Sequence, residues 1–428
     1  MGARTAFGSL VAVVFATGLV AAPLAVADDD DDAAPRNTAP VRPAPAKPVS
    51  PTRSVLVVSN NWAGTADFVD PHSFKRLFRL NIVPDLKQRL AEIQASPDKQ
   101  AYFLAIRELV GEGHDQYVDD SFTSPSGRYL YVSRPSLADV VAFDLKTRKI
   151  AWRVPVMGYR ADHMAISRDG RRLLVSASTA NVVHEIDTRK GKIVGNFPSG
   201  DSPHENNFSR DESLIYHASI GRVYTPTDDP SMEATKGKVV FEIVRARDLK
   251  VLREIDMNKK LEEFGRPDMS GAVRPMAIAP GERFVYFQVS FFHGFVEYDF
   301  KKDKVTRLYN LPLSQEAANL RREQYLLDSA HHGLNINPAG TKLCSAGTMS
   351  GYAAITSRKT GSARIIPVGH VPYWSTNSAD GKYCFVSVAG DDKVAVISYK
   401  KEEQVATIHV GDHPQRMRMG RVRRSFVP

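Results

Sequence analysis

The sequence is built around a repeated unit, which the stretch 159–200 shows most clearly. Four short segments, at 163–167, 172–176, 181–187 and 192–197, are rich in apolar residues that alternate or run in blocks. Gly, Asp, Asn and Ser separate these segments, a combination typical of short β-strands joined by tight turns. A single four-stranded sheet leaves its faces uncovered, so the unit needs copies of itself on either side.

Copies of the unit appear when the turn between its first and second strands is used for alignment. They lie at 124–145, 167–187, 209–219 (continued at 238–244), 279–300, 337–357 and 378–399. A further short strand follows each copy, at 150–154, 193–197, 251–255, 305–308, 363–368 and 405–410. The alignment therefore predicts six complete four-stranded sheets.

The two ends of the repeat region supply a seventh unit. Residues 54–83 contain its second, third and fourth strands, and residues 413–422 contain its first strand. Pairing the last strand with the first sheet closes a ring and leaves no open sheet edge. We therefore predict an all-β protein, a seven-bladed β-propeller of four-stranded antiparallel blades closed by its N- and C-terminal strands, with small helical insertions.

The repeat also carries a recognisable motif, G-x-x-P-x-x-φ-x-φ-S-x-D-G-x-x-φ-Y-V, where φ is apolar. It is clearest at 368–386 (VGHVPYWSTNSADGKYCFV) and at 200–216. This motif resembles the YVTN-type repeat of YncE-like seven-bladed β-propellers. The resemblance covers about 54–422 and implies the fold, whereas rings of this kind carry many unrelated activities.

Segments outside the blades predict how the chain is organised and where it resides. Residues 1–27 have the charged start, apolar run and Ala-Val-Ala end of a signal peptide, so we expect a secreted, extracellular or cell-envelope protein. Residues 28–53, acidic and then rich in Pro and Ala, are typical of a disordered linker. Apolar residues at helical spacing predict a helical insertion at about 84–111, and residues 423–428 form a tail.

Charge and motifs narrow the class of partner. The formal net charge of +9 favours anionic partners outside the cell, either an anionic small molecule or an acidic polysaccharide. The sequence has no zinc-finger spacing, RNP motif or long basic helix, so we do not expect nucleic acid as a partner. We expect no transmembrane span after signal cleavage, and a monomer.

The two cysteines, Cys344 and Cys384, lie in the second strands of neighbouring units. An exported protein permits a disulfide. Second strands of adjacent blades are usually farther apart than the ~5.5 Å between Cα atoms that a disulfide prefers. We therefore expect two buried thiols.

The connections that enter the first strand of each propeller blade gather at one end of the central channel. Residues seven or eight positions before the turn glycine, or its equivalent, should therefore share a pocket there. They are Asp119, Asp120, Asp162, His163, His204, Glu205, Arg274, Pro275, His332, Gly333, Tyr373, Trp374, Gln415 and Arg416. Loops between second and third strands add Asn61, Trp62, Arg134, Arg222 and His293. This convergence of histidine, arginine and carboxylate side chains favours a functional site.

The first interpretation is a pocket for an anionic, carbohydrate-like ligand, with lyase-type catalysis as its enzymatic form. Arginine binds carboxylates bidentately, and a histidine near a uronate can act as a base. The expected ligand-binding residues are Arg274, Arg222, Arg416, Asp120, Glu205, Trp62 and Trp374. The expected catalytic residues are His163, His332 and Tyr373. Polysaccharide lyases built on seven-bladed propellers are similar in architecture and residue types, although no lyase motif matches residue by residue.

The second interpretation is a metal site for Zn²⁺, Cu²⁺ or Mn²⁺, because imidazole is a common ligand of these ions. Its candidate ligands are His163, His204, His331, His332 and His293. The third interpretation is a cell-envelope interaction scaffold without catalysis. The sequence contains no nucleophile elbow, P-loop, dinucleotide-binding fingerprint or haem-attachment motif.

Overall fold

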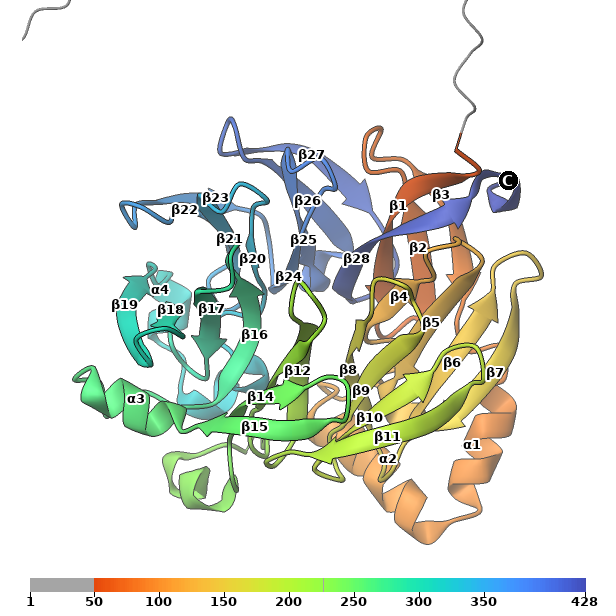
Figure 1. Cartoon of the computed structure of the whole chain (residues 1–428), viewed down its shortest axis with the longest axis horizontal. Helices are drawn as coiled ribbons and strands as arrows, with labels where there is room; N and C mark the ends of the chain where they lie inside the picture. The colour runs from red at the N-terminus through yellow and green to blue at the C-terminus, as the bar shows by residue number, and fades with distance from the viewer. Residues whose placement is uncertain (1–49, 226) are drawn as a thin grey trace, which may run out of the picture. The chain divides into compact units, whose positions relative to one another are not determined.

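In the computed structural model, which describes residues 50–225 and 227–428, seven four-stranded antiparallel sheets form the blades of a ring (Figure 1). The predicted fold class is confirmed. The signal peptide and most of the linker predicted for 28–53 lie outside the described residues. In the part of the chain that the structure describes, none of the helices has the length and apolar character needed to cross a membrane.

The strands follow the chain from the centre of the ring outwards in six blades, and the first blade combines both ends of the ring. Blade 1 consists of β28 (Pro414–Arg423), β1 (Thr52–Asn60), β2 (Thr65–Val69) and β3 (Arg76–Asn81). Blade 2 consists of β4 (Ser121–Thr123), β5 (Tyr129–Arg134), β6 (Asp139–Asp144) and β7 (Lys149–Pro155). Blade 3 consists of β8 (Ala161–Ile166), β9 (Arg172–Ala177), β10 (Val182–Asp187) and β11 (Lys192–Pro198).

The remaining four blades repeat this order. Blade 4 consists of β12 (Pro203–Phe208), β13 (Leu214–Ser219), β14 (Phe241–Arg245) and β15 (Lys250–Ile255). Blade 5 consists of β16 (Val273–Ile278), β17 (Phe284–Val289), β18 (Gly294–Asp299) and β19 (Lys304–Asn310). Blade 6 consists of β20 (Leu334–Ile336), β21 (Lys342–Gly347), β22 (Tyr352–Ser357) and β23 (Ala363–Pro367). Blade 7 consists of β24 (Pro372–Asn377), β25 (Tyr383–Val388), β26 (Lys393–Ser398) and β27 (Glu403–His409).

The ring closes through β1 and β28. Their antiparallel register runs from Thr52 opposite Arg423 to Asn60 opposite Pro414. β1 thus begins two residues before the start expected at 54, and β28 reaches one residue past the end expected at 422. Pairing the two ends of the repeat region satisfies backbone groups that an open first blade would expose.

The turn between the first and second strands explains the repeated S-x-D-G motif. In blade 3, the Ser167 hydroxyl donates to Asp169 Oδ1 at 2.7 Å, and the Gly170 amide donates to the Ser167 carbonyl at 2.8 Å. Gly170 adopts a φ of +70°, which favours glycine. A Cβ on Gly170 would lie only 2.3 Å from Pro125 Cδ in the preceding blade. Glycine is therefore required both for the turn and for the approach of neighbouring blades.

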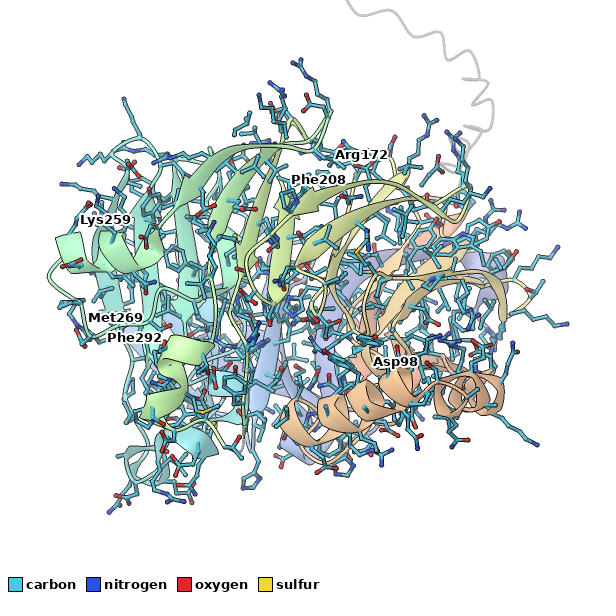
Figure 2. All side chains as sticks on the ribbon, turned by 90° about the horizontal axis from the view of Figure 1, so that it is seen from below. Asp98, Arg172, Phe208, Lys259, Met269 and Phe292 are labelled. Carbon is cyan, nitrogen blue, oxygen red and sulfur yellow. A yellow bond between two sulfur atoms is a disulfide. The ribbon has the colours of Figure 1, made fainter. Side chains whose placement is uncertain are left out.

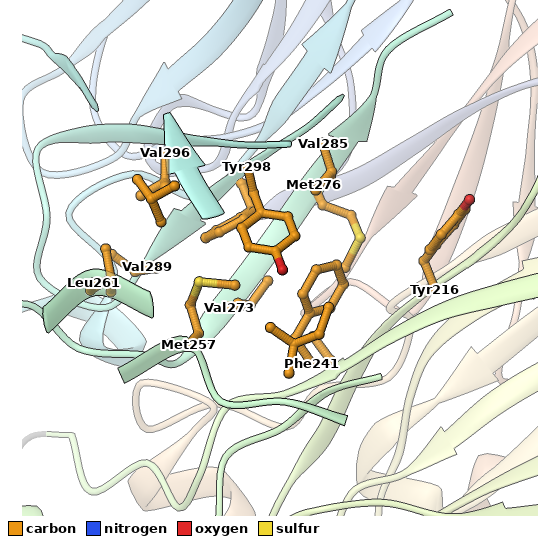
Figure 3. Close-up of a cluster of buried hydrophobic side chains, with 14 of the residues drawn as sticks. Tyr216, Phe241, Met257, Leu261, Val273, Met276, Val285, Val289, Val296 and Tyr298 are labelled. Atoms are coloured by element: carbon orange, nitrogen blue, oxygen red, sulfur yellow. The ribbon is translucent and has the colours of Figure 1, made fainter. Parts of the chain in front are cut away.

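The core lies mainly between the faces of adjacent blades. Between blades 4 and 5, Phe241, Met276 and Tyr298 pack together with Met257 and Leu261 (Figure 3). The last two residues belong to α3 (Met257–Glu263), a helix that the sequence did not predict. Burial of one such side chain contributes about 1.5–3 kcal/mol, so each interface between blades contributes strongly to folding.

The helical insertion at 84–111 and the helical turn η2 (Pro230–Thr235) lie on one side of the ring. The segment at 84–111 forms α1 (Leu86–Gln94) and α2 (Pro97–Leu109). Figure 2 shows α2, which carries Asp98, and η2 on the same side. The other short helices are α4 (Gln315–Ala318), η1 (Pro135–Leu137), η3 (Arg322–Gln324), η4 (Leu326–Asp328), η5 (Ala389–Asp391) and η6 (Arg424–Phe426).

A buried ion-pair network attaches the α1–α2 insertion to blade 2. The Arg134 side chain is fully buried and donates two hydrogen bonds to each of two carboxylates, Asp139 in β6 and Asp85 at the start of α1. Bidentate pairs of this kind fix orientation as well as adding energy. Arg134, expected among the pocket residues, therefore has an anchoring role.

The expectation of two free thiols is wrong: Cys344 in β21 and Cys384 in β25 form a disulfide between blades 6 and 7. Their Cα atoms are 6.6 Å apart, within the range that a disulfide spans. Small side chains at this interface, including Ala346, Ala353 and Ala395, let the two second strands approach more closely than bulkier residues would.

Candidate functional site

A cavity of about 600 Å³ lies at the centre of the ring, lined by residues of the innermost strands and by one face of α2. Each blade contributes at least one residue from the start of its innermost strand, or from the residues just before it. These residues are Arg416, Asp119, His163, His204, Arg274, His332 and Tyr373, in blade order. The structure therefore brings together side chains that are spread over almost 300 residues of sequence, as the repeat alignment indicates they should be.

Three of these side chains are histidines that face one another. The ring centroids of His163 and His204 are 3.6 Å apart, and that of His332 lies 6.3 Å from His163 and 5.8 Å from His204. One ring nitrogen from each lies within 4.8 Å of the others. We call these three residues the histidine trio. Burial lowers the pKa of each imidazole well below the ordinary value, and the nearby Arg416 guanidinium lowers it further, so all three are neutral at pH 7.

A buried carboxylate orients the first histidine of the trio. His163 Nδ1 lies 2.9 Å from Glu205 Oε2, and Asn207 donates to the other oxygen of Glu205 at 3.0 Å. Because Nδ1 donates its proton to the carboxylate, Nε2 of His163 carries a free lone pair. That nitrogen points towards Asp162, whose Oδ1 is 3.7 Å away.

Two arginine side chains are fully buried at the floor of the cavity. Arg416 donates through Nε to Asp119 Oδ1 at 3.0 Å. Arg274 donates to the hydroxyls of Ser290 and Ser329 at 2.9 and 3.0 Å. Arg416 Nη1 and Arg274 Nη2 have no hydrogen-bond partner among the described residues. A buried cation with unused donors is costly unless an anion completes its shell.

Carboxylates surround these arginines unevenly. Asp120 accepts two hydrogen bonds from Arg418, at 2.7 and 2.8 Å. Burial raises the pKa of Asp120, but the Arg418 guanidinium outweighs this effect, and the pKa lies below its ordinary value. Burial raises the pKa of Asp119 to about 7, which the Arg416 guanidinium counteracts only in part. Arg418 was absent from the expected set, but it lies two residues after Arg416 on β28, so strand alternation places both on one face.

Tyr373 packs against the trio from blade 7. Its ring stacks on His332 with centroids 4.2 Å apart, and burial raises its pKa far above neutrality. The phenol is therefore protonated at every physiological pH and can serve as a hydrogen-bond donor.

Other expected site residues lie behind or outside the cavity. Trp374 is buried beneath the arginines, with its ring 4.3 Å from Arg416 and 5.0 Å from Arg418, and Trp62 stacks between His114 and His413.

The remaining expected ligands fall into two further places. His331 and His293 form a separate pair, hydrogen-bonded to Tyr352 and Tyr325 respectively, at 3.2 and 2.9 Å. Arg222 is exposed at the rim and pairs with Asp201 at 3.3 Å.

The upper wall of the cavity is apolar, and sequence reasoning did not anticipate it. It consists of Tyr102, Ala105, Ile106, Leu109 and Val110 from the α2 region, with Ile220, Val223 and Leu327 from other insertions and loops. Their helical spacing predicted a packed helix, and only the fold shows that one face of this helix covers the channel. The site thus has an ionic floor and an apolar wall.

Comparison with known proteins gives the fold and no more. No protein-family model matches the sequence, and no curated protein sequence is similar to it. Among solved structures, a chain of hydrazine synthase from Kuenenia stuttgartiensis is similar, with a TM-score of 0.54 and 16% sequence identity. The similarity covers 69% of this chain and 88% of that chain. It supports the seven-bladed β-propeller fold and assigns no family.

Proposed function

We propose that this protein is an exported YVTN-type propeller whose central cavity binds a small ligand with an anionic group and an apolar portion. The observation that carries this proposal is the pair of buried guanidinium groups with unused donors at the cavity floor. The buried Cys344–Cys384 disulfide supports export, because such bonds persist in oxidising compartments.

The anionic group of the ligand is placed by Arg274 and Arg416. Their side chains are 0% and 1% exposed, yet both line the cavity. The donors of neither arginine are fully used by carboxylates. Arg416 makes one hydrogen bond to Asp119, and Arg274 lies 3.7 Å from Asp328. A ligand carboxylate entering between them gains charge-assisted hydrogen bonds in a low-dielectric site, where such bonds are strongest.

The apolar portion is placed by the α2 wall. Ile106 and Leu109 line the cavity, and Leu327 adds to this apolar surface. An apolar surface of this kind gains about 25 cal/mol for each Å² that a ligand removes from water. A ligand that is hydroxylated throughout gains little there.

An oligouronate is the competing ligand, with His163 or His332 as base and Tyr373 as proton donor. The two tryptophans expected to stack on a sugar ring lie outside the cavity lining. Of the tyrosines that line the cavity, Tyr373 already stacks on His332, which leaves Tyr102 and Tyr224 for a sugar. For this reason we favour the amphiphilic anion over the carbohydrate.

The test is isothermal titration calorimetry of the full chain with three probes: a medium-chain fatty acid, an aryl carboxylate and an oligogalacturonate. We expect the first two to bind and their matching alcohols not to bind. Replacing Arg274 or Arg416 with Met should weaken binding about 10- to 150-fold, because a hydrogen bond to a charged group contributes about 1.5–3 kcal/mol.

Arg283→Met is the matched control, since Arg283 pairs with Asp299 outside the cavity. Binding of the oligogalacturonate alone, with unsaturated product, would establish the lyase interpretation instead. If no probe binds and the Arg variants behave like the control, the interaction-scaffold interpretation stands and the proposal fails.

A further inference from the structure

The histidine trio has no assigned role in the anion site, and its geometry differs from that of the other buried histidines. His163, His204 and His332 come from three different blades, are at least 95% buried, and each bring one ring nitrogen within 4.8 Å of the others. His293 and His331, by contrast, each bind a tyrosine hydroxyl. Three neutral imidazoles that lie close together are a common ligand set for a transition metal.

The tautomer of His163 suits metal binding. Glu205 holds Nδ1–H of this residue, and Asn207 in turn fixes Glu205. A carboxylate behind a histidine fixes the ring and makes its other nitrogen a better ligand, and this arrangement is found repeatedly behind metal-bound histidines. Glu205 thus occupies the supporting position that such a site needs.

The other two histidines have unused nitrogens. Nδ1 of His204 and Nδ1 of His332 are buried and lack a hydrogen-bond partner among the described residues. A buried polar atom left without a partner is costly, and coordination of an ion between the three rings would satisfy such atoms.

The charge balance around the trio tolerates a divalent cation. Arg416, Arg418 and Arg160 each pair with one aspartate, at positions 119, 120 and 162 respectively. Glu205 is the additional carboxylate of this cluster, because its ionic contact is with the imidazole of His163. Arg274 is the additional cation near His204 and His332, with its nearest carboxylate, Asp328, 3.7 Å away. An anionic ligand in the cavity therefore supplies the negative charge that a divalent ion here requires.

We propose that His163, His204 and His332 bind one divalent transition metal ion of the Zn²⁺ class, oriented by Glu205 and with its remaining coordination position open to the cavity. The metal site is independent of the proposed anion binding, except that the anion is its expected additional ligand. It makes the cavity a metal centre rather than a simple ionic pocket.

The test measures zinc alone, without any organic ligand. Untagged full-length protein is loaded with Zn²⁺, dialysed, and examined by elemental analysis and X-ray absorption. We expect about one equivalent per chain, with three imidazole nitrogens at about 2.0–2.1 Å from the metal. His163→Ala, His204→Ala and His332→Ala should each abolish this stoichiometry, whereas His331→Ala and His293→Ala, which change equally buried or nearby histidines, should retain it.

Glu205→Gln keeps the proposal testable if a histidine variant fails to fold. It should retain zinc but weaken the affinity about 10- to 100-fold, the usual effect of removing a carboxylate behind a metal-bound histidine. Absence of zinc from the wild type, equal zinc content in the trio and control variants, or an absorption spectrum without imidazole would each overturn the proposal. Arg274→Met separates the two proposals, because it should weaken anion binding and leave zinc bound.

Discussion

Removing the bridge between Cys344 and Cys384 should cost a large part of the stability of blades 6 and 7. The two residues are separated by 40 positions, so the disulfide closes a loop of that length in the unfolded chain. The loop-closure entropy of an unfolded chain of this size, −2.1 − 1.5R ln n, corresponds to about 4 kcal/mol at 25 °C. Both cysteines are fully buried, so alanine is preferred to serine as the replacement, because a buried hydroxyl would add its own desolvation cost.

The assay is urea unfolding of Cys344→Ala/Cys384→Ala and of wild type with and without reductant, followed by tryptophan fluorescence. The double variant and the reduced wild type should lose about 2–5 kcal/mol of unfolding free energy, and reductant should not affect the variant. Thiol titration in urea without reductant should detect no free thiol in wild type. Two titratable thiols per chain, or a loss below about 1 kcal/mol, would refute this reasoning.

Three further predictions concern other parts of the ring. Burial and the neighbouring Glu254 raise the pKa of Glu242 to about 7. The folded state therefore holds this proton while the unfolded state releases it near pH 4.5, and stability falls by up to about 3 kcal/mol as pH rises from 4.5 to 7. Glu242→Gln should remove this fall in thermal melts at pH 5 and pH 8; an unchanged pH profile would contradict it. Arg134→Leu removes both hydrogen bonds of the buried Asp139 and leaves Arg89, 3.2 Å away, as its nearest cation. We therefore expect a loss of up to about 3 kcal/mol and faster proteolysis within 84–111. Deleting β28 should abolish cooperative folding in circular dichroism, because β1 loses its inner partner; a cooperative melt in the truncated chain would show that ring closure is dispensable.

The fold followed from local features of the sequence. Each S-x-D-G turn uses its own side chains and glycine, and the apolar residues around it alternate with the period of a strand. Such features act over a few residues, so they are visible without tertiary information. The incomplete first unit at 54–83 and the single strand at 413–422 predicted the ring closure that β1 and β28 make.

The identity of the site residues was also largely visible, because equivalent positions of a repeat occupy equivalent places in the ring. The sequence placed one polar residue from each blade at the same end of the channel. It did not show which of them would touch. His331 and His332 are adjacent in sequence, yet alternation along the chain sends one to Tyr352 and the other to the trio.

The sequence by itself therefore determined the four-stranded structure of each blade, the number of blades and the end of the channel at which each site residue lies. Only the tertiary structure decided the distances across the ring. It brought Cys344 within disulfide reach of Cys384, buried Trp374 beneath the arginines, and laid the apolar face of α2 over an ionic floor. The physical reason is that strand and turn preferences depend on neighbours in the chain, whereas contacts between blades depend on the volumes of side chains that lie far apart in sequence.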